Sequence, residues 1–240
     1  MKRLVLPRLY VILDASLLNQ SSNQAQRKQL EKECPETLLA AGVRLLQYRD
    51  KQAGARELLE KSRAIADLVR PRNALFFVND RPDVAYLAGA DGVHVGQHDL
   101  HCEQARAVIG SEKFVGVSTH NLEQFAAAAA TSADYIAVGP IFETRTKANP
   151  DPVVGAELVR RARALTDKPI VAIGGITLER SAEIIAAGAD SVAVISDILL
   201  APDPAARAAQ FVALLDGLPQ RNAPNKFPSS HATDTDVRLS

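Results

Sequence analysis

The stretch IVAIGGITLERSAEIIAAGADSVAVI, residues 170–195, decides the fold of this chain. It begins and ends with short apolar runs, at 170–173 and 191–195. Between them, a glycine pair leads into a helical pattern that closes on Ala187-Gly188-Ala189-Asp190, with glycine where a helix stops. Nearly continuous apolar runs are typical of parallel strands that are buried on both faces. The stretch therefore predicts one strand, one crossover helix and the next parallel strand.

The same plan repeats along the chain. Two more endings of this form occur, at Ala88-Gly89-Ala90-Asp91 and at Ala41-Gly42-Val43. We expect eight strands, at 9–13, 43–48, 74–78, 92–95, 114–117, 135–138, 170–173 and 191–195. The intervening segments are amphipathic, as over 54–70, where apolar residues recur at helical spacing. This repetition predicts the α/β class, as a single (β/α)8 TIM barrel with parallel strands.

The domain organisation follows from the length. The 240 residues are close to the roughly 250 of one such barrel. We expect the barrel over 1–217 and a polar, disordered tail over 218–240, while 16–33 forms a long first loop or an added helical turn. The alternative is an open doubly wound sheet. Against it, no GxGxxG motif follows the first strand, where Leu13-Asp14-Ala15-Ser16 stands instead.

Composition limits the class of partner. The 28 basic and 28 acidic residues balance, and the absence of tryptophan argues further against a nucleic-acid binder. No apolar stretch approaches the roughly 18 to 20 residues of a membrane span, and the start does not resemble a signal peptide, so we expect a cytoplasmic protein without membrane partners. Cys34 and Cys102 lack the spacing of a zinc site or a disulfide framework and are expected as thiols. A homo-oligomer is left open.

Polar motifs follow the expected strands, and a parallel barrel brings all strand ends to one face. Gln47, Arg49 and Lys51 alternate, so their side chains point the same way and could grip an anion. Alternatively, Arg49 and Lys51 cap the strand and are solvated. From these residues alone, the two interpretations carry equal weight.

Two carboxylates follow neighbouring strands. Asp80 and Asp99 could each cap the helix that comes next, which for Asp99 would begin near Leu100. They could also share one Mg²⁺, an ion that is usually held by one or two carboxylates, waters and substrate phosphate oxygens. The two roles are compatible, and we favour the metal site.

Phosphate binding is predicted at the last strands. Gly174-Gly175 and Ile195-Ser196 follow the seventh and eighth strands, where many barrels bind phosphate through backbone N–H groups. Thr144, Thr146 and Lys147 lie in a long segment of the kind that forms lids. Ser118, at the end of the fifth strand, could hydrogen-bond a phosphate or a leaving group.

The histidines are given no catalytic role. His94 lies within the fourth strand and is expected to be packed and hydrogen-bonded in the barrel. His98, His101 and His120 have no matching ligand cluster and are expected to be ordinary surface residues.

Five motifs in order, from about Leu9 to Leu215, resemble the thiamine-phosphate synthase family. They are Gln47-Tyr48-Arg49-Asp50-Lys51, Val78-Asn79-Asp80-Arg81, Asp91-Gly92-Val93-His94-Val95-Gly96-Gln97, Val138-Gly139-Pro140-Ile141-Phe142 with 144–147, and Ala172-Ile173-Gly174-Gly175-Ile176. The resemblance implies a (β/α)8 transferase that joins 4-amino-2-methyl-5-hydroxymethylpyrimidine diphosphate to 4-methyl-5-(2-hydroxyethyl)thiazole phosphate, giving thiamine phosphate and pyrophosphate. Its partners would be these two small phosphorylated molecules.

The resemblance also implies residue roles. The pyrimidine diphosphate would contact Gln47, Tyr48, Arg49, Asp50, Lys51, Asn79, Ser118 and Lys147, and Mg²⁺ would bind to Asp80 and Asp99. The thiazole phosphate would contact Thr144, Arg145, Thr146, a glycine of Gly174-Gly175, Ile195 and Ser196. As catalytic groups, Arg49, Lys51, Ser118 and Lys147 would assist a dissociative step by stabilising the leaving diphosphate. Glu143 stands where the family frequently has proline, which places closure of the lid and thiazole binding in question.

Two other functions are weighed. A thiazole tautomerase, a related barrel, would bind thiazole phosphate but would have no evident use for the cations and the carboxylate pair. A non-catalytic sensor of thiamine precursors would bind ligand without turnover, and fold alone does not distinguish it from an enzyme.

Overall fold

The computed structural model describes residues 4–18, 33–144 and 151–219, and it shows a closed barrel of eight parallel strands in sequence order. β1 pairs with β2 on one side and with β8 on the other, which closes the ring. The strands are β1 (Leu9–Asp14), β2 (Leu45–Arg49), β3 (Leu75–Asn79), β4 (Gly92–Val95), β5 (Phe114–Thr119), β6 (Tyr135–Val138), β7 (Ile170–Ile173) and β8 (Ser191–Val194). The predicted TIM barrel is confirmed.

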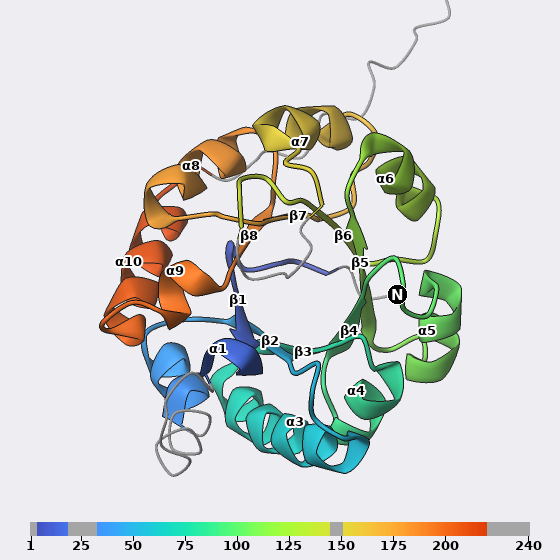
Figure 1. Cartoon of the computed structure of the whole chain (residues 1–240), viewed down its shortest axis with the longest axis vertical. Coiled ribbons are helices and arrows are strands. Elements are labelled where there is room, and N and C mark those ends of the chain that lie inside the picture. The colour runs from blue at the N-terminus through green and yellow to red at the C-terminus, as the bar shows by residue number, and fades with distance from the viewer. Residues whose placement is uncertain (1–3, 19–32, 145–150, 220–240) are drawn as a thin grey trace, which may run out of the picture.

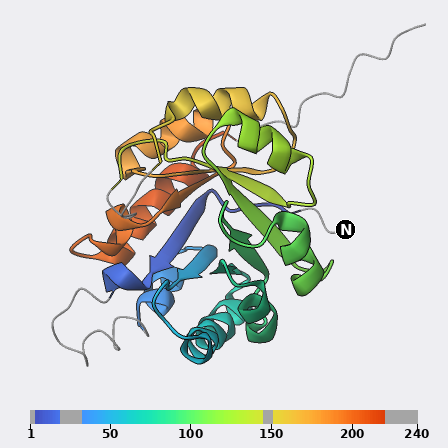
Figure 2. The same cartoon turned by 45° about the vertical axis from the view of Figure 1, so that its right-hand side comes forward.

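Helices surround the strands as an outer ring (Figure 1), and in the turned view the strands pass through the middle of the molecule (Figure 2). Residues 33–40 are also helical. The other helices are α1 (Ala15–Leu18), α3 (Ala55–Val69), the 3-10 turn η1 (Arg70–Arg72), α4 (Pro82–Ala88), α5 (Cys102–Ile109), α6 (Leu122–Ala129), α7 (Gly155–Arg163), α8 (Leu178–Ala186), α9 (Ser196–Leu199) and α10 (Pro204–Asp216).

Strand ends differ from the predicted ones by one or two residues. β2 starts at Leu45 instead of residue 43, and β5 continues to Thr119. A strand continues for as long as its residues pair with a neighbouring strand, whether or not they are apolar. β2 therefore extends to Arg49, which pairs with Asp14, and β5 extends to Thr119, which pairs with Val138. Most of the predicted first loop (16–33) and of the predicted tail (218–240) lies outside the described residues, at 19–32 and 220–240. At the start of the loop, α1 forms one helical turn directly after β1.

Aromatic side chains fill the interior of the barrel. The rings of Phe77 and Tyr135 meet edge to face with centroids 5.5 Å apart, and Tyr10 packs against both. Glycines at positions 92 and 116 make room, because a Cβ atom there would overlap the Phe77 and Tyr135 rings respectively. Because the interior is packed, a ligand site can form only at an end of the barrel.

A second core lies between the strands and the helices. α3 shows how the sequence produces it: Leu58, Ile65, Ala66 and Val69 are buried in this core, whereas Arg56 and Glu57 are exposed. Burying one apolar face of each helix against the strands provides the main driving force for the outer layer.

Three aspartates pin neighbouring strands together where the even-numbered strands begin. Asp91, Asp134 and Asp190 precede β4, β6 and β8, and each carboxylate accepts the backbone N–H of a residue in the preceding strand, at 2.9, 2.8 and 2.8 Å. Two of them are the aspartates of the repeated Ala-Gly-Ala-Asp endings.

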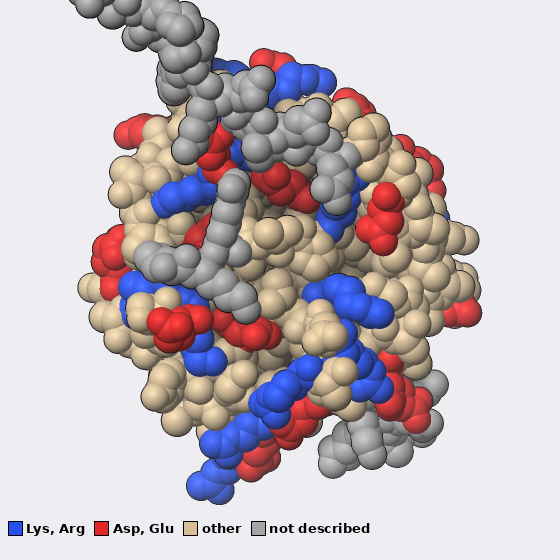
Figure 3. All heavy atoms as spheres, turned by 180° about the vertical axis from the view of Figure 1, so that it is seen from behind, with Lys and Arg blue, Asp and Glu red and all other residues tan. Residues whose placement is uncertain are grey.

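Seen from behind (Figure 3), basic and acidic side chains lie next to one another on the surface.

We expect Asp134→Ala to lower the free energy of unfolding by roughly 2–4 kcal/mol, because it leaves the Val115 N–H without its acceptor and removes the carboxylate that pairs with the largely buried Arg106 guanidinium, which keeps only carbonyl acceptors. Urea unfolding of both proteins measures the difference. Asp67→Ala is the matched control, since the partner of Asp67 within the described part of the chain is Arg70, on the exposed side of α3, and the loss of this pair should cost less than roughly 0.5 kcal/mol. Equal effects of the two substitutions would contradict the role of Asp134.

No helix within the described residues is both long and apolar enough to cross a lipid bilayer.

Candidate active site

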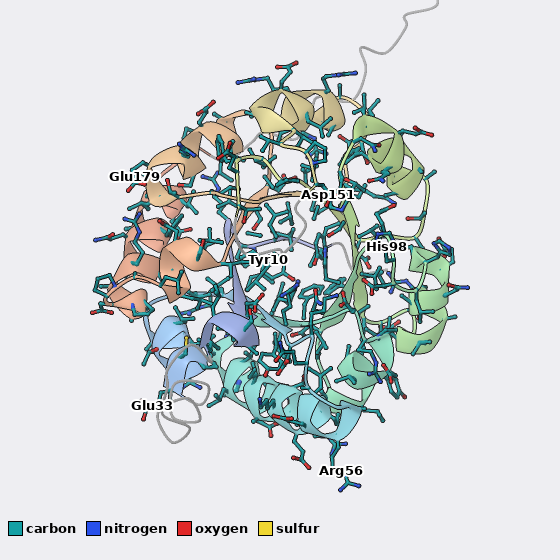
Figure 4. All side chains as sticks on the ribbon, in the orientation of Figure 1. Tyr10, Glu33, Arg56, His98, Asp151 and Glu179 are labelled. Carbon is teal, nitrogen blue, oxygen red and sulfur yellow. The ribbon has the colours of Figure 1, made fainter. Side chains whose placement is uncertain are left out.

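A cavity of about 380 Å³ opens at the carboxyl ends of the strands. Every strand, or the loop directly after it, contributes to its wall. Figure 4 shows Tyr10 near the centre of the barrel, with His98 and Asp151 farther out and Arg56 and Glu33 at the periphery. The lining residues are Ile12, Asp14, Gln47, Arg49, Lys51, Asn79, Asp80, His94, Gly96, Gln97, His98, Asp99, Ser118, His120, Gln124, Gly139, Pro140, Thr144, Asp151, Ile173, Gly174, Gly175, Ile176, Ala193, Ile195 and Ser196.

Both cations of the second strand's motif are paired with carboxylates at the cavity. Arg49 contacts Asp14, which is almost fully buried, and Lys51 contacts Asp80. Arg49 is therefore largely withdrawn from solvent, whereas the Lys51 side chain remains half exposed, with its ammonium group paired to Asp80. Asp14 was missed by sequence reasoning, although its position at the end of the first strand is the feature that could have identified it.

Tyr48 and Asp50 do not line the cavity, which is a correction to the interpretation of the whole motif as a contact surface. Side chains alternate along a strand, so these two point to the opposite side from Gln47 and Arg49. The Tyr48 hydroxyl donates to Asp50 at 3.2 Å, and Asp50 accepts two backbone N–H groups of the following turn, each at 3.0 Å. Their observed role is to shape the loop after β2.

Neither Asp80 nor Asp99 is the N-cap of the following helix, so the capping alternative is wrong for both. Arg81 caps α4, whereas α5 begins at Cys102 and not near Leu100, with His101 as its cap. Asp99 instead accepts the N–H of Gly96 at 2.8 Å within its own loop. Capping of the following helix therefore does not explain the position of either carboxylate.

The two carboxylates are close enough to influence each other. Burial raises the pKa of Asp80, the Lys51 ammonium opposes this effect, and the neighbouring Asp99 carboxylate adds to it. Oxygen donors of this kind suit Mg²⁺. Among the described residues, no cluster of three or more His, Cys, Asp or Glu forms a larger metal site. Two carboxylates are as many as Mg²⁺ usually takes from a protein, with waters and substrate oxygens as its other ligands.

His94 is packed and hydrogen-bonded, as expected, but it also reaches the cavity. Its Nδ1 lies 2.8 Å from the Tyr135 hydroxyl and its Nε2 lies 2.7 Å from Ser118 Oγ. Burial lowers the pKa of His94 to about 4, so the ring is neutral at pH 7. The side chain thus connects the barrel interior to Ser118, a contact that strand position alone did not indicate.

The lowered pKa of His94 predicts a stability change below neutral pH. The unfolded chain binds a proton near pH 6.5 and the folded chain only near pH 4, so the free energy of unfolding falls as pH drops through this window. Between pH 7 and pH 5 we expect wild type to lose roughly 2 kcal/mol that His94→Gln does not lose. Urea unfolding at both pH values checks this, and parallel losses in the two proteins would contradict it.

His98 and His120 also line the cavity, which corrects their assignment as ordinary surface residues. His120 donates from Nδ1 to the carbonyl oxygen of Gly139 at 2.7 Å, and its Nε2 lies 3.6 Å from Asp151 Oδ2. It thereby connects the end of β5 to the segment after β6. His101 lies outside the cavity lining and caps α5.

The predicted phosphate-binding loops meet on the other side of the cavity. Thr144, Gly174, Gly175, Ile195 and Ser196 all line it. Gly174 and Gly175 have φ angles of 103° and 63°, which glycine adopts without strain. A second hollow of about 720 Å³ adjoins this side and shares both Gly175 and Ser196.

The loop after β6 is fastened to the glycine pair. Phe142 donates its N–H to the Gly174 carbonyl at 2.9 Å, and the Arg180 guanidinium lies 4.6 Å from the centre of the Phe142 ring. Side chains at 174 and 175 would collide with this loop, a Cβ on Gly174 lying only 2.6 Å from Pro140. Glycine is therefore required for the close approach as well as for the backbone angles.

The amino end of α8 is already occupied in part. Leu178 donates its N–H to Asp197 at 3.2 Å, and Arg207 holds the same carboxylate at 2.9 Å. This backbone group is consequently not available to a phosphate. The remaining candidates for backbone binding are the glycine loop itself and the start of α9 at Ser196.

Three predicted contact residues, Arg145, Thr146 and Lys147, lie outside the described residues. Asn79, like the other described residues of the predicted site except Tyr48 and Asp50, lines the cavity. Gln97, Gln124 and Asp151 line it as well and were not predicted. Gln97 belongs to a motif that follows a strand, so its position was an available sign.

Comparison with known proteins identifies the family of the chain. The family model described as thiamine monophosphate synthase matches residues 10–198. The chain is 51% identical over 212 residues to the thiamine-phosphate synthase of Koribacter versatilis (strain Ellin345), covering 88% of this chain and 97% of that protein. It is 41% identical over 208 residues to the thiamine-phosphate synthase of Chloroflexus aurantiacus (strain ATCC 29366 / DSM 635 / J-10-fl), covering 87% and 92%.

A solved structure agrees as well. The thiamine phosphate pyrophosphorylase from Pyrococcus furiosus superposes with a TM-score of 0.76 at 32% identity, covering 87% of this chain and 95% of that one. The sequence motifs, the closed barrel and these relatives all lead to one conclusion: the chain belongs to the thiamine monophosphate synthase family.

Proposed function

We propose that this chain is a thiamine-phosphate synthase, a transferase that joins 4-amino-2-methyl-5-hydroxymethylpyrimidine diphosphate to 4-methyl-5-(2-hydroxyethyl)thiazole phosphate and releases pyrophosphate. The observation that carries the proposal is the division of one cavity into two polar sectors. β2 to β5 provide cations, carboxylates, amides and a serine, while β6 to β8 provide hydroxyls, a glycine loop and the Asp151 carboxylate. Two different phosphorylated substrates would face each other across the barrel mouth.

The described lining of the cavity carries a net negative charge, so binding a diphosphate there would need an additional cation. Its described lining contains the carboxylates of Asp14, Asp80, Asp99 and Asp151 but only the cations Arg49 and Lys51, a formal charge of −2 with neutral histidines. The described lining by itself therefore does not neutralise the charge of a diphosphate. Asp80 and Asp99 would hold Mg²⁺, and when bound the ion supplies charge neutralisation on the diphosphate oxygens.

The protein's own groups would act on the leaving diphosphate. Arg49, at the end of β2, and Lys51, in the loop that follows it, both line the cavity, and Ser118 offers a hydroxyl from β5. Negative charge grows on the diphosphate as its bond to the pyrimidine methylene breaks, so donors already in place stabilise the transition state more than the ground state. Lys147 is a further candidate from the family resemblance.

The methylene carbon becomes cationic in this dissociative scheme, and the aminopyrimidine delocalises the charge. The thiazole nitrogen then supplies the electron pair for the new bond, and no protein nucleophile is needed. Gly174, Gly175 and Ser196 would hold the thiazole phosphate on the facing side of the cavity. The protein's contribution is to orient the two substrates and to exclude water that would trap the cation.

The test is to supply purified protein with both phosphorylated precursors, with and without Mg²⁺, and to measure pyrophosphate and thiamine phosphate together. Equal, Mg²⁺-dependent formation of the two products is expected. Binding of thiazole phosphate without coupling, under any metal condition, would overturn the proposal and favour a tautomerase or a sensor. Pyrophosphate without thiamine phosphate would mean that water captures the cation and would contradict the proposed orientation of the substrates.

A further inference from the structure

A continuous chain of hydrogen bonds crosses the interior of the barrel beneath the cavity. It runs from Gln47 Nε2 to the Tyr10 hydroxyl at 2.8 Å and from Tyr10 to the Tyr135 hydroxyl at 3.1 Å. It continues from Tyr135 to His94 Nδ1 at 2.8 Å and from His94 Nε2 to Ser118 Oγ at 2.7 Å. Both ends line the cavity, whereas the two tyrosines are fully buried in the barrel core.

The direction of this chain follows from counting protons. The amide nitrogen of Gln47 can only donate, so Tyr10 accepts from it. Tyr135 is the one remaining partner of the Tyr10 hydroxyl within the described residues, and a buried hydroxyl proton needs an acceptor. Tyr10 therefore donates to Tyr135. Only one proton can lie between these two oxygens, so Tyr135 in turn donates to His94 Nδ1.

The same count fixes the tautomer of His94. Because Nδ1 accepts, the ring proton of the neutral imidazole is on Nε2, which donates to Ser118 Oγ. Ser118 is then an acceptor on the side facing His94, and its own hydrogen is free to turn toward the cavity. Each link polarises the next, so the series makes Ser118 a better donor than an isolated serine would be.

We propose that Tyr10 and Tyr135 are positioning residues that fix His94 as the Nε2–H tautomer and orient the Ser118 hydroxyl as a hydrogen-bond donor into the cavity. The kinetic part rests on the proposed function, in which Ser118 donates to the leaving diphosphate. The tautomer itself does not depend on the identity of the substrate. Neither tyrosine needs to touch a substrate, since Tyr135 acts through His94 and Tyr10 acts through Tyr135.

The first test is nuclear magnetic resonance of the full chain with ¹⁵N in the histidine rings, where protonated and unprotonated ring nitrogens differ widely in chemical shift. The His94 signals are assigned by their loss in His94→Gln. We expect a proton on Nε2 and none on Nδ1. A proton on Nδ1 would mean that the chain runs in the opposite direction and would overturn the proposal.

Two hydroxyl deletions give the matched comparison. Tyr135→Phe removes the donor to Nδ1 and should shift the His94 ring signals toward a mixture of tautomers. Tyr10→Phe removes the proton that directs the Tyr135 hydroxyl toward Nδ1, so it should shift the same signals in the same direction but by less. Tyr86→Phe, on the exposed side of α4, is the control and should change neither ring nitrogen. Unchanged signals in Tyr135→Phe would also overturn the proposal.

Kinetics separate positioning from a merely structural effect. Tyr135→Phe should lower kcat roughly three- to tenfold, the size expected for one neutral hydrogen bond, with a smaller change in KM. The double variant Tyr135→Phe with Ser118→Ala should be no slower than Ser118→Ala alone, since Tyr135 acts through Ser118. If the loss of kcat in the double variant equals the product of the losses in the two single variants, this coupling is contradicted. If wild type releases no pyrophosphate, the proposed function fails, and the tautomer measurement still decides the hydrogen-bond proposal.

Discussion

Asp80→Asn is expected to lower kcat by roughly 100- to 1000-fold, the loss typical when one charge-stabilising group is removed from a preorganised site. The substitution keeps the size of the side chain but removes the charge that would hold Mg²⁺ and that pairs with Lys51. It also leaves Asp99 as the remaining member of the carboxylate pair. The expected result is therefore a weaker response to Mg²⁺ as well as a lower maximal rate.

The measurement is product formation against Mg²⁺ concentration, together with calorimetric titration of the protein with Mg²⁺ and inorganic pyrophosphate. Asp99→Asn should show the same two losses. Asp67→Asn is the matched control, because Asp67 is an exposed residue of α3 that pairs with Arg70. If Asp80→Asn retains the full Mg²⁺-dependent rate, the assignment of this residue to the metal is wrong.

Gly175→Ala is expected to lower kcat/KM for the thiazole phosphate by roughly 30- to 1000-fold. An alanine at φ +63° costs about 1 kcal/mol, and its Cβ would overlap the Glu143 carbonyl oxygen and lie 2.9 Å from Phe142 Cβ. Displacing that packed loop adds about 1–3 kcal/mol. If the loop moves to relieve this strain, binding of the thiazole phosphate must restore it, and the sum of about 2–4 kcal/mol, converted at 1.4 kcal/mol for each factor of ten, gives the predicted range.

Gly54→Ala is the control for this substitution. Gly54 has φ −67° and nothing within 4 Å of an added Cβ, so kinetics and stability should stay close to those of wild type. KM for each substrate and the unfolding midpoint are measured for both variants. An unchanged KM for thiazole phosphate in Gly175→Ala would remove the glycine loop from that binding site, whereas an equal rise in KM for both substrates would indicate a general distortion of the cavity.

The effect of Glu143 bears on the same loop. The family resemblance implies proline at this position, and here the Glu143 carbonyl oxygen packs against Gly175. The contact is made by the backbone, so it does not depend on the glutamate side chain. The departure from the family pattern therefore leaves the close packing of the loop after β6 against the glycine pair intact.

Much of the site could be predicted because its residues follow strands in a parallel barrel. Gln47, Arg49, Asn79 and Ser118 all reach the cavity for this reason. The incorrect predictions concern the direction of single side chains and the exact ends of strands. Tyr48 and Asp50 stand in the same motif but on the other side of the strand, and His120 follows a strand that was expected to end earlier.

The sequence by itself determined the (β/α)8 fold, because eight apolar runs with helical segments between them have few other ways to bury their surfaces. It also determined which end carries the site, since parallel strands share one direction. Only the tertiary structure decided the pairing of Arg49 with Asp14 and the chain from Gln47 through Tyr10, Tyr135 and His94 to Ser118. Those contacts join residues far apart in sequence, and strand register and barrel closure, which no local pattern encodes, bring them together.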